Sequence, residues 1–132
     1  MRIKVDYHSD IPIYKQIVSE VEDAILSKDL NEGDELPSIR KLAIEANVNP
    51  NTVAKSYFVL QAKGYIYSIA GVGYRVAKPP QNSVEERLKE LENDMKAIVT
   101  KMVNFSMTKE EIEERIFRIV ERVIKSGSGD KG

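Results

Sequence analysis

The stretch from Leu36 to Tyr57 constrains the fold more than any other part of the chain. Ser38 follows Pro37, and its hydroxyl can accept a hydrogen bond from an unpaired backbone N–H at the start of a helix. Apolar residues at spacings of three and four then mark one face of that helix: Ile39, Leu42 and Ala43. Asn47 tolerates the left-handed conformation that ends many helices. The pattern predicts a short capped helix that stops at Asn47.

A second helix is expected immediately after this turn. Asn49 is a good N-cap, and Pro50 suits the first helical position, where its missing N–H has no partner to lose. The inward face is apolar and contains Val53, Tyr57 and Leu60. The outward face is polar and contains Asn51, Thr52 and Lys55, which can bond to base edges or phosphates. Two capped helices at a tight turn are typical of a DNA-reading helix-turn-helix, and also of helical hairpins whose polar face only meets water.

The flanking residues favour a winged helix. Residues 12–27 carry apolar side chains at helical spacing and predict a helix that packs on the other two. Gly64 ends the second capped helix, and residues 65–77 predict two short strands around the turn Gly71-Val72-Gly73. Before them, Met1–Asp6 is expected to be extended or frayed. The fold class expected for residues 1–78 is therefore an α+β winged helix-turn-helix domain.

Pro79 and Pro80 mark a boundary, because consecutive prolines cannot continue a strand or enter a helix interior. Beyond them, two pairs of residues have the spacing of a capping box: Ser83 with Glu86 and Thr108 with Glu111. We therefore expect an all-α two-helix hairpin over residues 79–126, with a break at residues 104–107. Residues 127–132 are rich in glycine and serine and are expected to form a disordered tail.

Both C-terminal helices carry an apolar stripe. The first follows a heptad seam that contains Val84, Leu88, Leu91, Met95, Ile98, Met102 and Phe105. The stripe of the second contains Ile112, Ile116, Ile119, Val120, Val123 and Ile124. Two helices cannot bury both stripes, and a hairpin of this size is too small for a comfortable core of its own. A bundle with the same hairpin of a second chain solves the problem, so we expect a helical dimerisation domain and a homodimer.

Several motifs of the first part occur together in a known family. They are Ile13-Tyr14-x-Gln16-Ile17, Gly33-Asp34-x-Leu36-Pro37-Ser38-x-Arg40-x-Leu42-Ala43, Val48-Asn49-Pro50-Asn51-Thr52-Val53, Tyr57-x-x-Leu60 and Gly64-Tyr65-Ile66. In these motifs the chain resembles the DNA-binding domain of GntR-family bacterial transcription regulators, from about residue 11 to residue 76. Its short C-terminal part resembles the YtrA subfamily, whose members carry a small helical dimerisation domain. The resemblance implies a cytoplasmic regulator that binds double-stranded DNA and, by family habit, more often represses. For a dimer, the operator is expected to be an inverted repeat.

The resemblance also implies which residues contact DNA. Arg40 matches an arginine that the family uses at the start of the second helix. Ser38, Asn49, Asn51 and Thr52 match positions that contact phosphates or bases, Lys55 lies near positions that are often basic, and Gly71 and Gly73 match the wing-tip glycines.

The wing departs from the family pattern at two positions. Ala70 and Val72 stand where relatives often have a basic residue or histidine, which weakens the expectation of a minor-groove contact. Arg75 is an alternative cation, but it lies within the second strand, where the sequence does not fix its direction.

The net charge of −1 does not have the basic excess that is usual for nucleic-acid binders. Between Arg40 and Lys78, however, Glu45 is the only acid, and the basic residues are Arg40, Lys41, Lys55, Lys63, Arg75 and Lys78. This distribution predicts a local basic face on a neutral domain, with salt-sensitive specific binding. The chain has no cysteine, no signal-peptide pattern at its N-terminus, and no apolar run near the roughly 20 residues of a membrane span.

Other functions find less support in the sequence. Met95, Met102 and Met107 allow a pocket for an unidentified small-molecule effector, although methionine on a heptad seam is usually core. The acidic run at residues 109–114 is explained by the helix dipole rather than by a metal site. No motif of an enzyme or of a cofactor site occurs. The alternative to a DNA-binding regulator is a winged-helix protein-interaction module that does not bind DNA.

Overall fold

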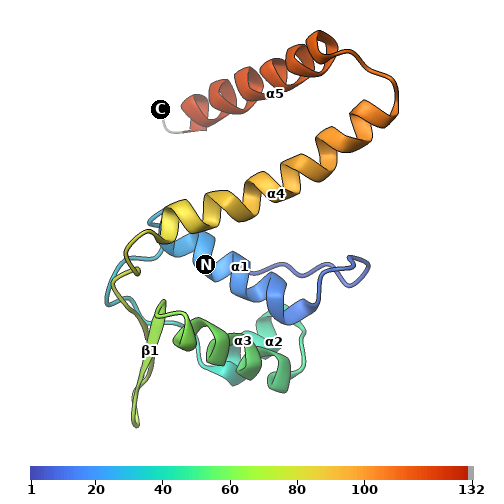
Figure 1. Ribbon diagram of the computed structural model, residues 1–132. Helices are drawn as coiled ribbons and strands as arrows, with labels where there is room; N and C mark the ends of the chain where they lie inside the picture. Colours follow the sequence, from blue (N-terminus) through green and yellow to red (C-terminus); the bar gives the residue numbers. More distant parts are fainter. Residues whose placement is uncertain (131–132) are drawn as a thin grey trace. The chain divides into compact units, whose positions relative to one another are not determined.

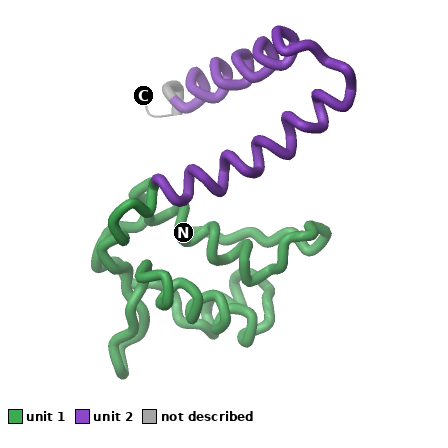
Figure 2. The backbone as a smooth tube through the Cα atoms, in the orientation of Figure 1, with its two compact units in different colours: residues 1–84 green, residues 85–132 purple. Residues whose placement is uncertain are grey.

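The computed structural model describes residues 1–130 of the chain. It divides into two compact units, residues 1–84 (unit 1) and the residues from 85 onward (unit 2), as Figure 2 shows. None of the helices within residues 1–130 is both long and apolar enough to cross a membrane.

Unit 1 is a winged helix (Figure 1). Its three helices come first: α1 (Ile13–Leu26), α2 (Ile39–Ala46) and α3 (Pro50–Ala62). The strands β1 (Ile66–Ile69) and β2 (Gly73–Val76) then form an antiparallel pair, in which Ile66 lies opposite Val76 and Ile69 opposite Gly73. The predicted order of three helices and a hairpin is therefore confirmed.

Both caps of the helix-turn-helix are present. Ser38 Oγ accepts a hydrogen bond from the Lys41 N–H at 3.1 Å. Asn49 Oδ1 accepts one from the Asn51 N–H at 2.8 Å. Between the two helices, Asn47 has a φ of 55°, the left-handed conformation predicted for it. Each of these interactions joins near neighbours in the sequence, which is why local residues could predict where α2 ends and α3 begins.

The core of unit 1 lies between the three helices and the hairpin. Val53, Tyr57 and Leu60 of α3 are fully buried, as predicted. The Tyr57 hydroxyl donates to the Pro37 carbonyl at 2.6 Å, and the Tyr57 ring meets Tyr74 edge-on with the ring centroids 4.8 Å apart. Burial, reinforced by Tyr74, raises the pKa of Tyr57 well above its ordinary value. The hydroxyl therefore stays protonated and keeps its hydrogen bond across the physiological pH range.

The N-terminal segment is packed rather than frayed. Ile3 belongs to the buried core, and the Tyr7 hydroxyl donates to the Asn47 carbonyl at the turn before α3. The Gln16 side chain holds Asp6 from both sides: its amide nitrogen donates to the Asp6 carbonyl at 2.9 Å, and its oxygen accepts from the Asp6 N–H at 2.8 Å. Of the two alternatives left open by the sequence, the frayed one is therefore wrong.

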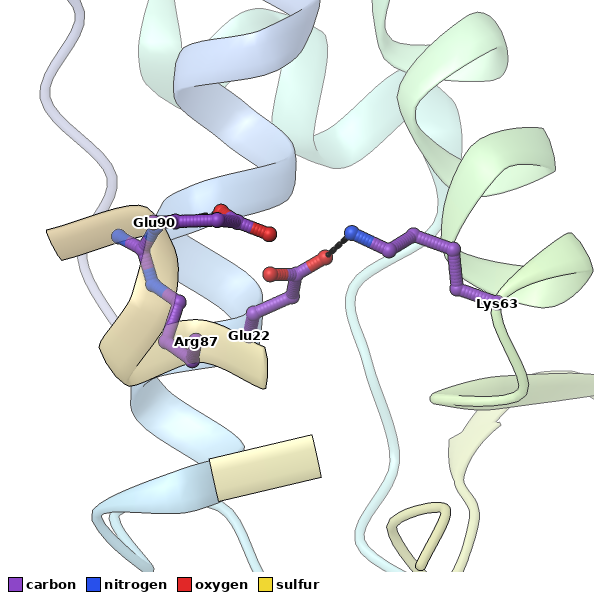
Figure 3. A network of polar contacts seen from close by, with 4 residues as sticks. All are labelled: Glu22, Lys63, Arg87 and Glu90. Carbon is purple, nitrogen blue, oxygen red and sulfur yellow. Dashed lines mark hydrogen bonds and ion pairs between the residues drawn. The ribbon is translucent and has the colours of Figure 1, made fainter. Parts of the chain in front are cut away.

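Glu22 and Lys63 form an ion pair between α1 and the end of α3 (Figure 3). Lys63 Nζ lies 2.5 Å from Glu22 Oε1; the Glu22 side chain is 3% exposed and that of Lys63 is 41% exposed. A buried carboxylate requires such a partner, so the pair holds the C-terminal end of α3 against α1. Lys63 was expected on a basic outer face, but its ammonium group is directed at Glu22.

Two long helices complete the chain, α4 (Ser83–Asn104) and α5 (Lys109–Asp130). The predicted capping box of α5 is present: the Glu111 N–H donates to Thr108 Oγ1 at 3.1 Å, and the Thr108 N–H donates to Glu111 Oε1 at 2.9 Å. Hydrogen bonding from Thr108, first from its backbone N–H and second from its side chain, holds the pKa of Glu111 below its ordinary value, because it favours the charged carboxylate.

The predicted end of the second C-terminal helix is wrong. Helix α5 continues to Asp130, whereas a disordered tail was expected over residues 127–132; residues 131–132 of that tail lie outside the described residues. Once a helix is established, each further residue adds a backbone hydrogen bond, and this gain offsets the weak helix propensity of glycine and serine.

The boundary between the units also falls later than residue 78. Unit 1 extends to Val84 because the proline segment packs back onto it: a β-carbon at Gly64 would lie 3.3 Å from Pro80 Cγ. Helix α4 begins at Ser83 itself, which was predicted to precede the helix as its cap.

Candidate nucleic-acid interface

The helix-turn-helix exposes most of the polar residues predicted to contact DNA. Those exposed are Ser38, Arg40, Asn49, Asn51 and Lys55, while Thr52 is half-buried. Ser38 and Asn49 cap the N-termini of α2 and α3, whose backbone N–H groups and dipoles favour phosphate. Arg40 lies in the first turn of α2 and has no ion-pair partner among the described residues. The helix-turn-helix therefore offers exposed hydrogen-bonding groups and a guanidinium group.

Tyr14 of α1 supports the recognition helix α3 at Lys55. Lys55 Nζ lies 3.9 Å from the centroid of the Tyr14 ring, a cation–π contact. The buried Ser56 hydroxyl makes short contacts to two carbonyl oxygens, that of Tyr14 at 3.1 Å and that of Thr52 at 2.9 Å. The first turn of α1 is thereby fixed to the middle of α3, and the Lys55 ammonium is held in a defined place.

The wing tip is apolar. Gly71 has a φ of 76° and Gly73 a φ of 129°, conformations that side chains rarely adopt, so the tight turn requires both glycines. Between them, Val72 is 52% exposed. Arg75 does not compensate for the missing tip cation, because its guanidinium donates to the Gly33 carbonyl at 3.1 Å. Among the predicted contacts, the wing therefore offers backbone groups and apolar side chains rather than charge.

The basic surface is smaller than the sequence suggested. Lys63 pairs with Glu22, Arg75 bonds to Gly33, and Lys41 lies 4.0 Å from Glu45. Arg40 and Lys55 are the two cations that the helix-turn-helix presents without an acidic partner in the described part of the chain.

Comparisons with known proteins agree with this geometry. The family model for bacterial regulatory proteins of the gntR family matches residues 13–76. YhcF of Bacillus subtilis, an uncharacterized HTH-type transcriptional regulator, is 33% identical over 110 residues, which cover 83% of this chain and 91% of that protein. The HTH-type transcriptional repressor YtrA of the same organism is 33% identical over 98 residues, or 74% of this chain and 75% of that protein. The solved structure of YtrA from Sulfolobus acidocaldarius, a GntR-family transcription factor, is 35% identical with a TM-score of 0.55 and covers 92% of this chain and 98% of that chain.

The chain belongs to the GntR family. The predicted family and winged-helix fold are thus confirmed, and the match to the solved YtrA covers both parts of the chain, as the predicted YtrA resemblance requires. This GntR protein is a DNA-binding transcription regulator and not an enzyme.

Two residues of the GntR domain were not singled out from its sequence. Tyr14 was noted only as part of a motif, and its contact with Lys55 joins residues far apart in the chain, so no local signal announces it. Phe58 lies on α3 and is 72% exposed. Helical spacing could have identified it, because it stands seven residues after Asn51 and three after Lys55, on the same face of α3.

Proposed function

We propose that the protein is a cytoplasmic, sequence-specific repressor of transcription that binds an inverted-repeat operator as a homodimer. The observation that carries the proposal is the exposure of the apolar stripes on α4 and α5.

The exposed stripes are those expected at a dimer interface. On α4, Leu91 is 41% and Ile98 60% exposed, and Leu88 and Met95 lie in the same range. On α5, Val120 and Val123 are also exposed. Met102 and Ile116 are half-buried, and Ile112 is buried. Monomeric proteins rarely leave a continuous apolar surface of this length uncovered, which supports a partner on this face.

A second copy of the chain is the partner that fits. Among the described residues, α4 and α5 diverge from the loop at residues 105–108 and do not pack side by side (Figure 1). Each chain therefore leaves the apolar stripes of α4 and α5 exposed. A second copy has the same two stripes, so two copies can bury them against one another in a symmetric bundle. Met95 and Met102 lie on this seam, so we assign them to packing rather than to an effector pocket.

Dimerisation determines the form of the operator. Two copies related by a two-fold axis present two recognition helices in opposite directions, which requires two half-sites in inverted orientation. In each half-site we assign base reading to Arg40 and to the start of α3. Ser38, Asn49, Asn51, Thr52 and Lys55 are assigned to contacts with bases or phosphates. Gly71 and Gly73 are assigned to the close approach of the wing to the DNA backbone. The repressor role rests on similarity to YtrA of Bacillus subtilis, which is named a repressor.

The proposal is tested by selecting bound sequences from a random DNA pool with the whole protein and measuring its mass by sedimentation. We expect inverted repeats and a dimer. Leu91→Lys should give a monomer with weak operator binding, whereas Asn93→Lys, an exposed position off the seam, should leave the dimer intact. A dimer that persists in Leu91→Lys, or selected sites without two-fold symmetry, would contradict the proposal. Failure to select any DNA would favour a protein-interaction module.

A further inference from the structure

The outer face of α3 carries an aromatic side chain among polar ones. Asn51, Lys55 and Phe58 follow one another at intervals of four and three residues, so they lie along one line of the helix. Phe58 is 72% exposed, while the adjacent Tyr57, about 100° further around the helix axis, is fully buried. The hydrophobic core of unit 1 is therefore built without Phe58, and burial within the unit does not explain this residue.

The surroundings of Phe58 match DNA as its occupant. Helix α3 contains no acidic residue, and Lys55 places an ammonium group one turn before Phe58. Gln61 is the next polar residue along α3 toward the wing. Its amide nitrogen donates to Ser68 Oγ at 3.4 Å, so its side chain is turned toward β1. The exposed ring thus has a cation and an amide near it and no acid on the same helix. These surroundings suit DNA, a polyanion with apolar groups in its groove, better than a protein surface.

We propose that Phe58 is a specificity-determining residue whose ring packs against the 5-methyl group of a thymine in the major groove. The inference rests on the proposed function, because it requires α3 to lie in the groove of a specific site. Seven residues of helix separate Asn51 from Phe58, about 10 Å along the axis, which corresponds to roughly three base-pair steps. Thymine is the base that presents a methyl group there, and phenylalanine is a suitable apolar partner for it. Phe58 thus selects thymine a few base pairs away from the bases that meet the start of α3.

Deoxyuridine provides the test, because it differs from thymidine only by the 5-methyl group. Sites are first selected with the whole wild-type protein, and each thymine of one half-site is then replaced in turn by deoxyuridine. At one position the wild-type protein should bind about fourfold more weakly, the value of one buried methyl group. Phe58→Ala should bind the thymine-containing site more weakly and lose this discrimination, whereas Phe58→Leu, which keeps an apolar side chain, should retain part of it. Thermal unfolding should differ little among the three proteins, since Phe58 is exposed.

The possible outcomes separate the two proposals. If Phe58→Ala shows the same deoxyuridine penalty as the wild type, or if no thymine is sensitive, the thymine contact is refuted while the proposed function stands. A change of oligomeric state in Phe58→Ala, with methyl discrimination unchanged, would assign the ring to a contact between copies and overturn the inference. If the protein selects no DNA, both proposals fail.

Discussion

The Lys55 ammonium group lies 3.9 Å from the centroid of the Tyr14 ring, so a residue of α1 determines where a cation of the recognition helix stands. Ser56, the residue next to Lys55, also contacts the Tyr14 carbonyl oxygen, at 3.1 Å. A flexible lysine that must be immobilised on DNA loses side-chain entropy, and the ring reduces that loss by ordering the lysine beforehand. Tyr14 is in this sense a positioning residue for the DNA-binding face.

Replacing Tyr14 tests this role. We expect Tyr14→Leu to weaken operator binding about two- to fivefold, the value of an exposed cation–π contact. The salt dependence of binding should stay the same, because Lys55 and its charge remain. Tyr14→Phe keeps the ring and should bind like the wild type. Lys55→Met should instead reduce the salt slope by about one, and adding Tyr14→Leu to it should cost little more. Tighter binding by Tyr14→Leu in a salt titration would show that the ring competes with DNA for the lysine.

Arg40 has a different expected signature. If its guanidinium reads a base, Arg40→Ala should lose about 1–3 kcal/mol of binding free energy per half-site and relax the preference at one base pair. The neighbouring Lys41, which lies 4.0 Å from Glu45, provides a control: Lys41→Ala should leave base preference unchanged. Repeating the selection from random DNA with both variants measures this. An unchanged preference in Arg40→Ala would remove Arg40 from base reading.

These residues also show how far the sequence alone could lead. Ser38, Asn47 and Asn49 were identified correctly because caps and turns depend on residues two to four positions away. The heptad seam of α4 was equally readable, since its period is local. Lys63 was wrongly placed on the basic outer face, and the direction of Arg75 could not be predicted, because their partners stand 41 and 42 residues away in the chain. Side-chain direction at such positions is decided by tertiary contacts, which no local pattern records.

The Glu22–Lys63 pair provides a stability prediction. Lys63→Met leaves a carboxylate that is 3% exposed without this ammonium partner, and we expect a loss of about 1–3 kcal/mol in the free energy of unfolding. Lys15→Met, at an exposed position of α1, should change stability little. Urea denaturation of both variants at one protein concentration makes the comparison, because dimerisation links stability to concentration. The double variant Glu22→Gln/Lys63→Met should recover part of the loss; equal losses in the single and double variants would argue against charge burial as the cause.

Glu111 provides a pH prediction. Its pKa is lowered in the folded protein by the bonds to Thr108, so its contribution to stability is complete above the ordinary value of 4.5. The contribution decreases as the pH falls through the lower, folded-state pKa, where the carboxylate takes up a proton. Carbon NMR titration of the Glu111 carboxyl should show the lowered pKa in the wild type and a return toward 4.5 in Thr108→Val, which lacks the hydroxyl. A pKa unaffected by this substitution would mean that the Thr108 hydroxyl does not stabilise the carboxylate.

The apolar wing tip makes a gain of binding possible. Val72 is 52% exposed between Gly71 and Gly73, and Arg75 is turned toward Gly33. Val72→Lys adds a cation to a wing tip that has none. If the wing approaches the phosphate backbone, this variant should bind the operator more tightly, and the dependence of its affinity on salt should become steeper by about 0.9 per wing. Val72→Gln, which adds polarity without charge, should leave the slope unchanged. Measuring the operator affinity of the three proteins between low and physiological salt separates these cases. An identical slope in Val72→Lys would place the wing tip away from the DNA and leave recognition to the helix-turn-helix alone.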